Sequence, residues 1–307
     1  MRQRRPFAAL TAFAFALAFA AATPAASQFV LDGREELAFD RPEAWAMAWF
    51  AAVSLPTALG DPSPSAAGAV ELAVEGGWIP TLSEEQRTVG FLGTKPEDLN
   101  RTSAFGRLRL TAGLPGQWSV SAGVVPPVEI GGIEPALVSL AVGRPLWQGE
   151  RALLGARLVA QDGRFRGDIT CAEDAAAAPG DPERNPYNCE APSRDELRLR
   201  LYGVELQAAT RLQRLPGVTP YASLGWSRLD AEFQVDARYN DLVDRTRLLT
   251  DGDLWWATVG ASWSGGGRLR LSAEAFYAPL DVVRTAGGRV ENDPLLNARA
   301  AISYRLR

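Results

Sequence analysis

Arginine and glutamate side chains recur at alternate positions in several apolar segments of this 307-residue chain. In RLRLSAEAFYA, residues 268–278, Arg268, Arg270 and Glu274 share one parity, and leucines and alanines occupy the other. Because side chains alternate between the two faces of a β-strand, the segment predicts a strand with one polar and one apolar face. Arginines and carboxylates that face each other can form ion pairs, and arginines in excess can bind an anion.

Cysteine and histidine usage limits the other chemistry. Cys171 and Cys189 lie close together in a polar segment, and in an exported protein such a pair predicts a disulfide. The chain has no histidine and no further cysteine, so we expect no metal site and no cofactor. A serine nucleophile would lack its usual histidine base, which argues against an enzyme, although a carboxylate pair could still serve as the base.

The first 27 residues have the pattern of a secretory signal peptide. Arg2, Arg4 and Arg5 precede an apolar stretch at 7–22, and small residues lead to a cleavage site near Ser27. The formal net charge of the whole chain is −4, and removal of these arginines makes the exported chain more acidic. An acidic chain is not expected to bind nucleic acid.

Residues 28–67 differ from the rest of the chain and predict a short helix followed by a linker. Asp40 is the expected N-cap, with Pro42 and Glu43 in the first turn. The run that follows is apolar on all sides but too short to span a bilayer. It predicts a plug formed by Trp45, Met47, Trp49 and Phe50.

Residues 68–307 predict about ten strands separated by turns, with eight or twelve as alternatives. The expected strands cover residues 69–79, 102–114, 117–126, 135–144, 151–165, 198–211, 218–235, 254–264, 268–279 and 296–306. The connections alternate between long polar segments and short turns such as SGGG at 264–267. Sorting of this kind is typical of a membrane barrel, which has tight turns at one rim and long loops at the other.

Together, the signal peptide, the alternating strands and the sorted loops resemble a Gram-negative outer-membrane β-barrel over residues 68–307. No motif matches a functionally characterised family. The resemblance implies an all-β, closed, up-and-down antiparallel transmembrane barrel in the cell outer membrane. Its expected partners are membrane lipid and the barrel assembly machinery.

In such a barrel the apolar face meets lipid and the polar face lines the lumen. A phase slip near Tyr202 and Gly203 predicts a bulge. Ten strands leave a narrow interior, so either a structural ion-pair network or an arginine-lined path with an anion site fits. The predicted lumen residues are Glu71, Glu75, Arg107, Arg109, Arg157, Arg198, Arg200, Glu205, Gln207, Arg268, Arg270, Glu274, Arg299 and Arg305.

Aromatic residues cluster near the ends of the predicted strands, as expected for two interfacial belts. One belt would hold Trp118, Trp147, Trp263 and Tyr304, and the other Trp78, Trp226, Trp255 and Tyr277.

These features favour a barrel for narrow passive transport or for binding a small ligand. In a variant of this transport hypothesis, the solute is hydrophobic and the plug gates its path, as in the larger fatty-acid transporters that share this architecture. The alternative is a structural or adhesin-like surface barrel, supported by an extended strand through Phe233 and Val235 and by the disulfide-tied loop 166–197. A barrel enzyme without histidine is the third hypothesis.

Overall fold

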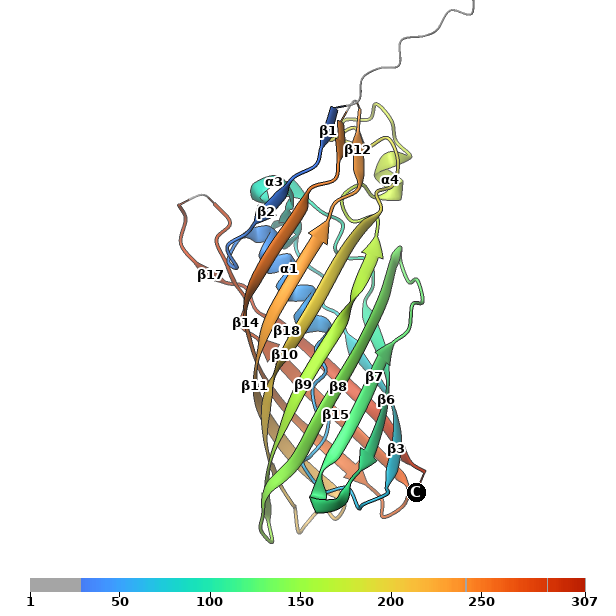
Figure 1. Cartoon of the computed structure of the whole chain (residues 1–307), viewed down its shortest axis with the longest axis vertical. Helices are drawn as coiled ribbons and strands as arrows, with labels where there is room; N and C mark the ends of the chain where they lie inside the picture. Colours follow the sequence, from blue (N-terminus) through green and yellow to red (C-terminus); the bar gives the residue numbers. More distant parts are fainter. Residues whose placement is uncertain (1–28, 241, 286, 307) are drawn as a thin grey trace, which may run out of the picture.

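The computed structural model describes residues 29–240, 242–285 and 287–306; the predicted signal peptide lies outside them. Ten antiparallel strands form a closed barrel, in which β18 pairs with β3 and β11 pairs with β14 (Figure 1). The barrel strands are β3 (Val70–Trp78), β6 (Ala104–Gly113), β7 (Ser119–Val125), β8 (Ile133–Gln148), β9 (Ala152–Gly167), β10 (Asp195–Thr210), β11 (Val218–Gln234), β14 (Arg247–Ser264), β15 (Leu269–Ala278) and β18 (Leu295–Arg305). The predicted all-β barrel fold is confirmed.

Smaller elements lie in the lumen and at the two rims. They are β1 (Phe29–Leu31), β2 (Arg34–Glu36), α1 (Pro42–Ser54), α2 (Glu84–Arg87), β4 (Thr88–Val89), α3 (Gly90–Gly93), β5 (Lys95–Pro96), the 3-10 turn η1 (Pro115–Gln117), α4 (Glu173–Ala176), β12 (Ala237–Tyr239), β13 (Leu242–Asp244), β16 (Asp281–Val282) and β17 (Glu291–Asn292). No helix in the described part of the chain is long and apolar enough to cross a membrane.

The two rims of the barrel differ in their connections. Short turns join the strands at the rim where the chain ends, and long segments join them at the opposite rim (Figure 1). In barrels of this type the short turns are periplasmic and the long loops extracellular. One predicted boundary is wrong: β14 begins at Arg247, not at 254, because it pairs with β11 as far as Gln234.

The barrel wall has an uneven height. Strands β8 to β11 and β14 have 16 to 18 residues, whereas β3, β6 and β7 have 7 to 10. At about 3.3 Å per residue, β14 is about 60 Å long, roughly twice the length of β3. Figure 1 shows the long strands continuing toward the extracellular rim beyond β3, β6 and β7.

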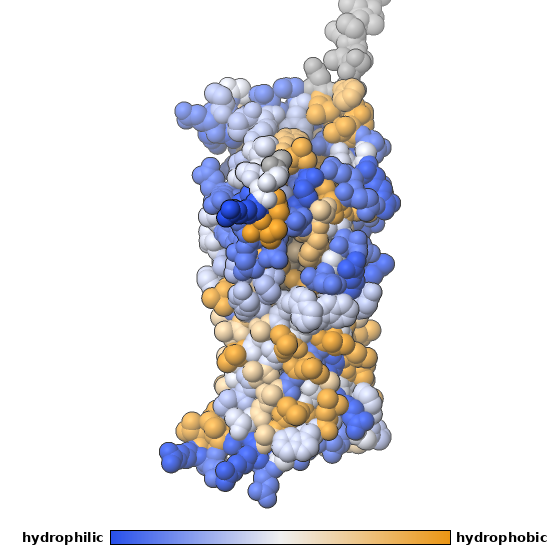
Figure 2. All heavy atoms as spheres, turned by 90° about the vertical axis from the view of Figure 1, so that its left-hand side faces the viewer, coloured by the Kyte–Doolittle hydropathy of each residue, from blue (hydrophilic) through white to orange (hydrophobic). Residues whose placement is uncertain are grey.

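An apolar band surrounds the lower part of the barrel, where Figure 2 shows hydrophobic side chains gathered below a mainly hydrophilic upper part. The aromatic residues of the two predicted belts are exposed there, except Trp226, which is partly buried. A closed barrel with this band satisfies its backbone hydrogen bonds internally and exposes apolar side chains to acyl chains. The chain is therefore an outer-membrane β-barrel. Exposed members of the band include Leu72, Val74, Leu108, Leu110, Val124, Val138, Leu140, Leu154, Leu158, Val204, Leu206, Leu224, Val259, Leu271, Leu296 and Ile302.

Helix α1 lies inside the upper half of the barrel (Figure 1). It begins at Pro42, and its N-cap is Arg41, which makes no side-chain capping bond. The predicted cap at Asp40 is therefore wrong: proline fixes the first helical position one residue later than an Asp40 cap requires. Nearly all of α1 is buried because the barrel surrounds it, which explains why its sequence is apolar on every side.

Candidate functional site in the barrel lumen

Strand β10 shows how the inner and outer faces of the barrel change along its height. Below Tyr202, Glu205 and Gln207 point inward while Val204 and Leu206 face lipid. Above Tyr202, Leu197, Leu199 and Leu201 point inward, and the charged residues Arg198 and Arg200 between them are exposed. The lumen is therefore polar in its lower half and apolar in its upper half.

This reversal corrects two predicted lumen residues. The side chains of Arg198 and Arg200 are 65% and 70% exposed and point outward. They pair with Glu196 at 2.6 Å and with Asp162 at 3.2 Å, also on the outer face. The prediction failed because the wall extends above the membrane there, so water lies outside and the helix inside.

The bulge predicted near Tyr202 and Gly203 is also wrong. Both residues pair in continuous register with β9 and β11, and the inward parity does not change along β10. The strand itself is regular. The sequence pattern changes phase because the apolar face is the outer face below Tyr202 and the inner face above it. The register of the barrel shifts instead between Pro145 and Trp147 on β8.

Arg299 binds the C-terminal end of α1 in the middle of the lumen. Its guanidinium donates to the carbonyl oxygens of Ala52 at 2.7 Å and of Leu55 at 2.8 Å, and it lies 3.7 Å from the ring centroid of Phe276. The last carbonyl groups of a helix have no partner within the helix and carry partial negative charge. The buried guanidinium of Arg299 supplies hydrogen-bond donors to these carbonyl oxygens and positive charge beside them.

Arg107 and Arg109 extend this contact along the chain below α1. Arg107 donates to the carbonyl of Ser54 and, at 2.9 Å, to the side-chain oxygen of Gln161. Arg109 donates to the carbonyl of Ala58 at 2.9 Å and pairs with Glu75 at 2.8 Å. Two adjacent positions on the inner face of β6 therefore hold the carbonyl groups of three residues of the descending segment, Ser54, Thr57 and Ala58.

Glutamates complete the network from the other side of the lumen. Glu205 accepts from the backbone N–H of Ala58 at 3.1 Å and from Arg157 at 3.0 Å. Glu274 accepts from Thr57 at 2.5 Å and from Tyr221 at 3.1 Å. We call this set the clamp: Glu75, Arg107, Arg109, Arg157, Glu205, Glu274 and Arg299.

The other predicted lumen residues lie closer to the periplasmic rim. Gln207 donates to the carbonyl of Gly60 at 3.0 Å, and Arg270 and Glu71 are partly buried beside residues 58–65. Arg268 and Arg305 are exposed at the rim. The prediction that they lie inside the lumen is corrected, because both lie where the strands meet the turns.

The four predicted plug residues all belong to α1. Trp45, Met47 and Trp49 are at most 3% exposed, and Phe50 is partly buried. Phe50 packs edge-on against Trp49 at a centroid distance of 5.3 Å and against Phe165 of β9 at 5.4 Å. Leucines of β10, β11 and β14 surround the helix.

Two apolar cavities lie beside α1 and share Phe50 and Leu99. The first has a volume of about 310 Å³ and lies between the helix and the extracellular loops, lined by Met47 and Phe91. The second has about 350 Å³ and lies between the helix and the wall formed by β6 to β8, where Trp49 lines it. The cavity around the segment below the clamp measures only about 100 Å³.

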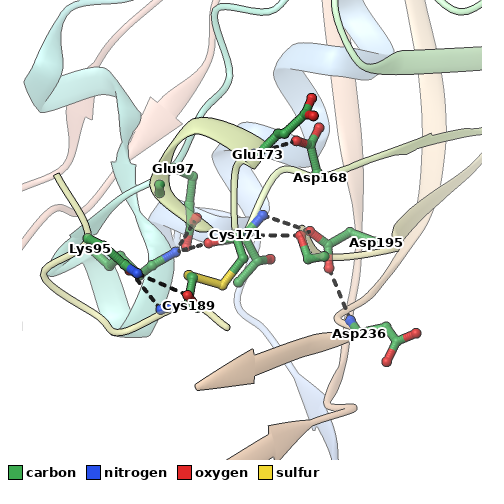
Figure 3. The surroundings of a disulfide bond; sticks show 12 residues. Lys95, Glu97, Asp168, Cys171, Glu173, Cys189, Asp195 and Asp236 are labelled. Carbon is green, nitrogen blue, oxygen red and sulfur yellow. Dashed lines mark hydrogen bonds and ion pairs between the residues drawn. A yellow bond between two sulfur atoms is a disulfide. The ribbon is translucent and has the colours of Figure 1, made fainter. Parts of the chain in front are cut away.

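The extracellular loops pack together above the helix, and the predicted disulfide lies among them. Cys171 and Cys189 are bonded, with their Cα atoms 5.7 Å apart (Figure 3). Asp195 accepts hydrogen bonds from the backbone of Thr170 and of Asp236, which belong to different loops. We call this layer the cap: residues 80–103, 168–194, 235–240 and 242–246 together with β1.

Lys95, the single lysine of the chain, is buried in the cap. Its Nζ lies 2.5 Å from a carboxylate oxygen of Glu97 and donates to the carbonyl of Thr170, also at 2.5 Å (Figure 3). Burial raises the pKa of the Glu97 carboxyl to about 8, although Lys95 opposes the shift. Protonation of this group therefore affects the stability of the cap near neutral pH.

Other predicted features are placed as follows. Phe233 and Val235 do extend the β11 segment, but they pack toward the interior beside the core and the cap. Among the described residues, no group of three or more histidine, cysteine, aspartate or glutamate side chains could hold a metal ion.

No protein-family model matches the chain, and no curated protein matches its sequence. The outer membrane protease OmpT from Escherichia coli is similar in structure at a TM-score of 0.39 and 10% identity, over 78% of this chain and 92% of that protein. The attachment invasion locus protein Ail of Yersinia pestis gives 0.28 at 11% identity, over 78% and 100%. The toluene transporter TbuX of Ralstonia pickettii gives 0.33 at 9%, over 81% and 92%. These similarities concern the fold alone.

Proposed function

We propose that the protein binds a small apolar molecule in the upper lumen, against the side of α1. The observation that carries the proposal is the pair of apolar cavities that meet at Phe50 and Leu99. Cavities of this size are near the lower limit for small-molecule sites, and a cavity of about 150 Å³ already accommodates benzene. The expected ligand is therefore a small aromatic or short aliphatic molecule.

The lower lumen favours this proposal over passage of a water-soluble solute. The clamp and Gln207 hold the backbone of α1 and of residues 57–60 at several points. Buried polar networks of this kind are costly to break one partner at a time. A solute moving along the axis would need the whole descending segment to leave.

The first cavity also has a few polar groups at its edge, as ligand sites usually do. Glu43 and Glu97 contribute to its lining, among otherwise apolar side chains. Glu43 is already engaged, because it accepts a hydrogen bond from the backbone of Leu92 at 2.8 Å. The lining therefore favours an apolar ligand over a charged one.

The test is fluorine NMR with 4-fluorotoluene as the probe and the barrel in lipid nanodiscs. We expect a resonance for bound probe that is separate from the resonance of probe dissolved in lipid. Phe50→Trp, which fills space shared by the two cavities, should weaken binding at least tenfold. Leu140→Trp, on the lipid-facing side of β8, is the matched control and should bind normally. Absence of a bound resonance in the unmodified protein would overturn the proposal.

A surface-interaction barrel remains the second candidate, because apolar side chains are exposed at the extracellular end. Phe29 is 67% exposed and Leu92 is 64% exposed. Exposed apolar groups outside the membrane are typical of contact surfaces. If they mediate attachment, Phe29→Ser combined with Leu92→Ser abolishes cell adhesion while the barrel still assembles; unchanged adhesion excludes this role for them.

A further inference from the structure

The barrel wall has an interruption between β6 and β8. Strand β7 ends at Val125, and its pairing with β6 stops at Leu108 and with β8 at Leu137. Residues 104–107 of β6 and 133–136 of β8 consequently have no strand between them, although each pairs on its other side.

The sequence explains why β7 stops. Pro126 and Pro127 follow its last residue, and neither has a backbone N–H to donate to a neighbouring strand. Gly131 and Gly132 then adopt positive φ angles of 61° and 80°, which reverse the chain into β8. The interruption is therefore encoded in the seven residues after Val125 and does not depend on a ligand.

The second cavity passes through this interruption. Trp49, Val53 and Phe165 line it from inside the barrel. Val74 and Leu108 line it too, and these side chains are 56% and 45% exposed on the outer face. In an intact part of the wall, inward-facing and outward-facing side chains lie on opposite sides of the strands. One cavity can therefore contact side chains of both faces only where the wall is open.

The outer end of the cavity lies at the upper edge of the apolar band. Leu108 is paired with Val74 and Val124, and Val124 is paired with Val138, so an apolar row borders the opening. The next outward-facing positions of β8 above Val138 are Ala136 and Glu134, where charge begins. The opening therefore faces the outer leaflet near its headgroup boundary.

We propose that this opening is a lateral portal through which a small apolar molecule moves between the lipid and the cavities beside α1. The inference rests on the proposed function, because it supplies the route to that binding site. The molecule would pass Leu108 and Val128 and reach Phe50 without crossing the clamp or the cap.

The alternative routes are more strongly obstructed. Above the helix, the disulfide and the hydrogen bonds of Asp195 and Lys95 hold the cap loops together. Below it, the clamp fixes the chain across the lumen. The portal is bordered mainly by apolar side chains and by the loop at 126–132, which contributes no residue to the pairing between barrel strands.

Gly106 offers a way to narrow the portal from outside. It lines the cavity on the outer face of β6, and a Cβ there would meet only a backbone oxygen of Glu75, at 3.7 Å. Gly106→Phe can therefore be accommodated and places a ring at the opening. Ala273→Phe, on the exposed face of β15, adds the same ring to the band away from the portal and is the control.

The experiment measures exchange of 4-fluorotoluene between lipid and site by fluorine exchange NMR in nanodiscs. Gly106→Phe should slow both the association and the dissociation of the probe at least tenfold. Val128→Trp, in the loop at the opening, should act in the same direction if Gly106→Phe fails to assemble. The control should exchange at the unmodified rate.

The outcomes separate the two proposals. If binding persists and both portal variants exchange at the unmodified rate, the portal is overturned and the binding site stands. If Ala273→Phe slows exchange equally, the effect is not local and the portal is again overturned. If the unmodified protein binds no probe, the proposed function fails and the portal fails with it.

Discussion

The lower and upper halves of this barrel use the same strands with opposite polarity. In the lower half, acyl chains lie outside and a buried ionic network lies inside. In the upper half, charged pairs such as Arg200 with Asp162 lie outside, and leucines pack on α1 inside. Strand geometry decides only which residues share a face. The medium on each side, which changes at the membrane surface, decides which face is apolar.

The two halves also stabilise α1 by different means. Apolar contact surrounds its body, and the clamp holds its C-terminal carbonyl groups. The clamp has four arginines and three glutamates, so its excess positive charge faces the negative end of the helix dipole. The following predictions separate these contributions, beginning with the largest effect.

Loss of Arg299 should have the largest effect. Arg299→Met removes the charged donor from the carbonyl groups of Ala52 and Leu55, each of which keeps one backbone donor, and removes positive charge beside the buried Glu274. Breaking a buried ionic contact costs about 3–5 kcal/mol. Urea unfolding in detergent micelles measures this loss. Arg200→Met, on the exposed outer face, should cost less than about 0.5 kcal/mol; equal losses would show that burial does not distinguish the halves.

Removal of the disulfide should affect the cap and leave the membrane band intact. Cys171→Ser with Cys189→Ser frees a loop with a sequence separation of 18, which corresponds to about 3 kcal/mol of lost chain constraint. We expect trypsin to cleave faster after Arg184, within that loop. The urea midpoint of the barrel should stay constant; a parallel drop would mean that the cap and the band unfold as one unit.

Leu199→Ala tests the apolar interior of the upper half. Leu199 is 1% exposed beside α1, and its truncation leaves a cavity that should cost about 2–3 kcal/mol. Leu206→Ala removes the same atoms from the lipid-facing side of the same strand, where no protein cavity forms, and should cost less than about 1 kcal/mol. Both values come from the same unfolding assay. A larger loss for Leu206 would contradict the reversal of polarity.

The last prediction concerns pH, where the effect for a change of one pH unit is the smallest. Glu97 has an ordinary pKa of 4.5 and a folded pKa of about 8, so the folded cap binds more protons than the unfolded cap between these values. Cap stability should therefore fall as pH rises from about 5 to 8, by at most about 1.4 kcal/mol per pH unit. Amide hydrogen exchange of residues 94–98, corrected for intrinsic rates, measures this. Glu97→Gln should remove the dependence; its persistence would assign it to another group.

Strand parity predicted the barrel and most of the lower lumen correctly. Glu75, Arg107, Arg157 and Arg299 could be found because alternation alone fixes their face once lipid lies outside. Arg198 and Arg200 were assigned to the wrong face because their sequence contains no mark of the membrane surface. The leucines that alternate with them give the same sequence pattern whether lipid or water lies outside the strand.

The cavities and the wall interruption could not be predicted in the same way. Phe50 and Leu99 are distant in sequence and meet only when the loop at 80–103 folds over α1. The sequence did carry one signal that could have been used: Pro126 and Pro127, followed by two glycines, mark where β7 ends. The resulting gap between β6 and β8 could not be predicted, because the neighbours of β7 are known only from the closed barrel.

The path of residues 29–69 has a consequence for assembly. The described N-terminal residues lie at the extracellular rim, α1 and residues 55–65 descend through the lumen, and β3 starts at the periplasmic rim (Figure 1). The polypeptide therefore traverses its own barrel once before building the wall. Glu75 on the first barrel strand and Arg299 on the last both belong to the clamp around that segment. The seam between these two strands is therefore fastened from inside by the same segment that carries the N-terminal residues to the extracellular rim.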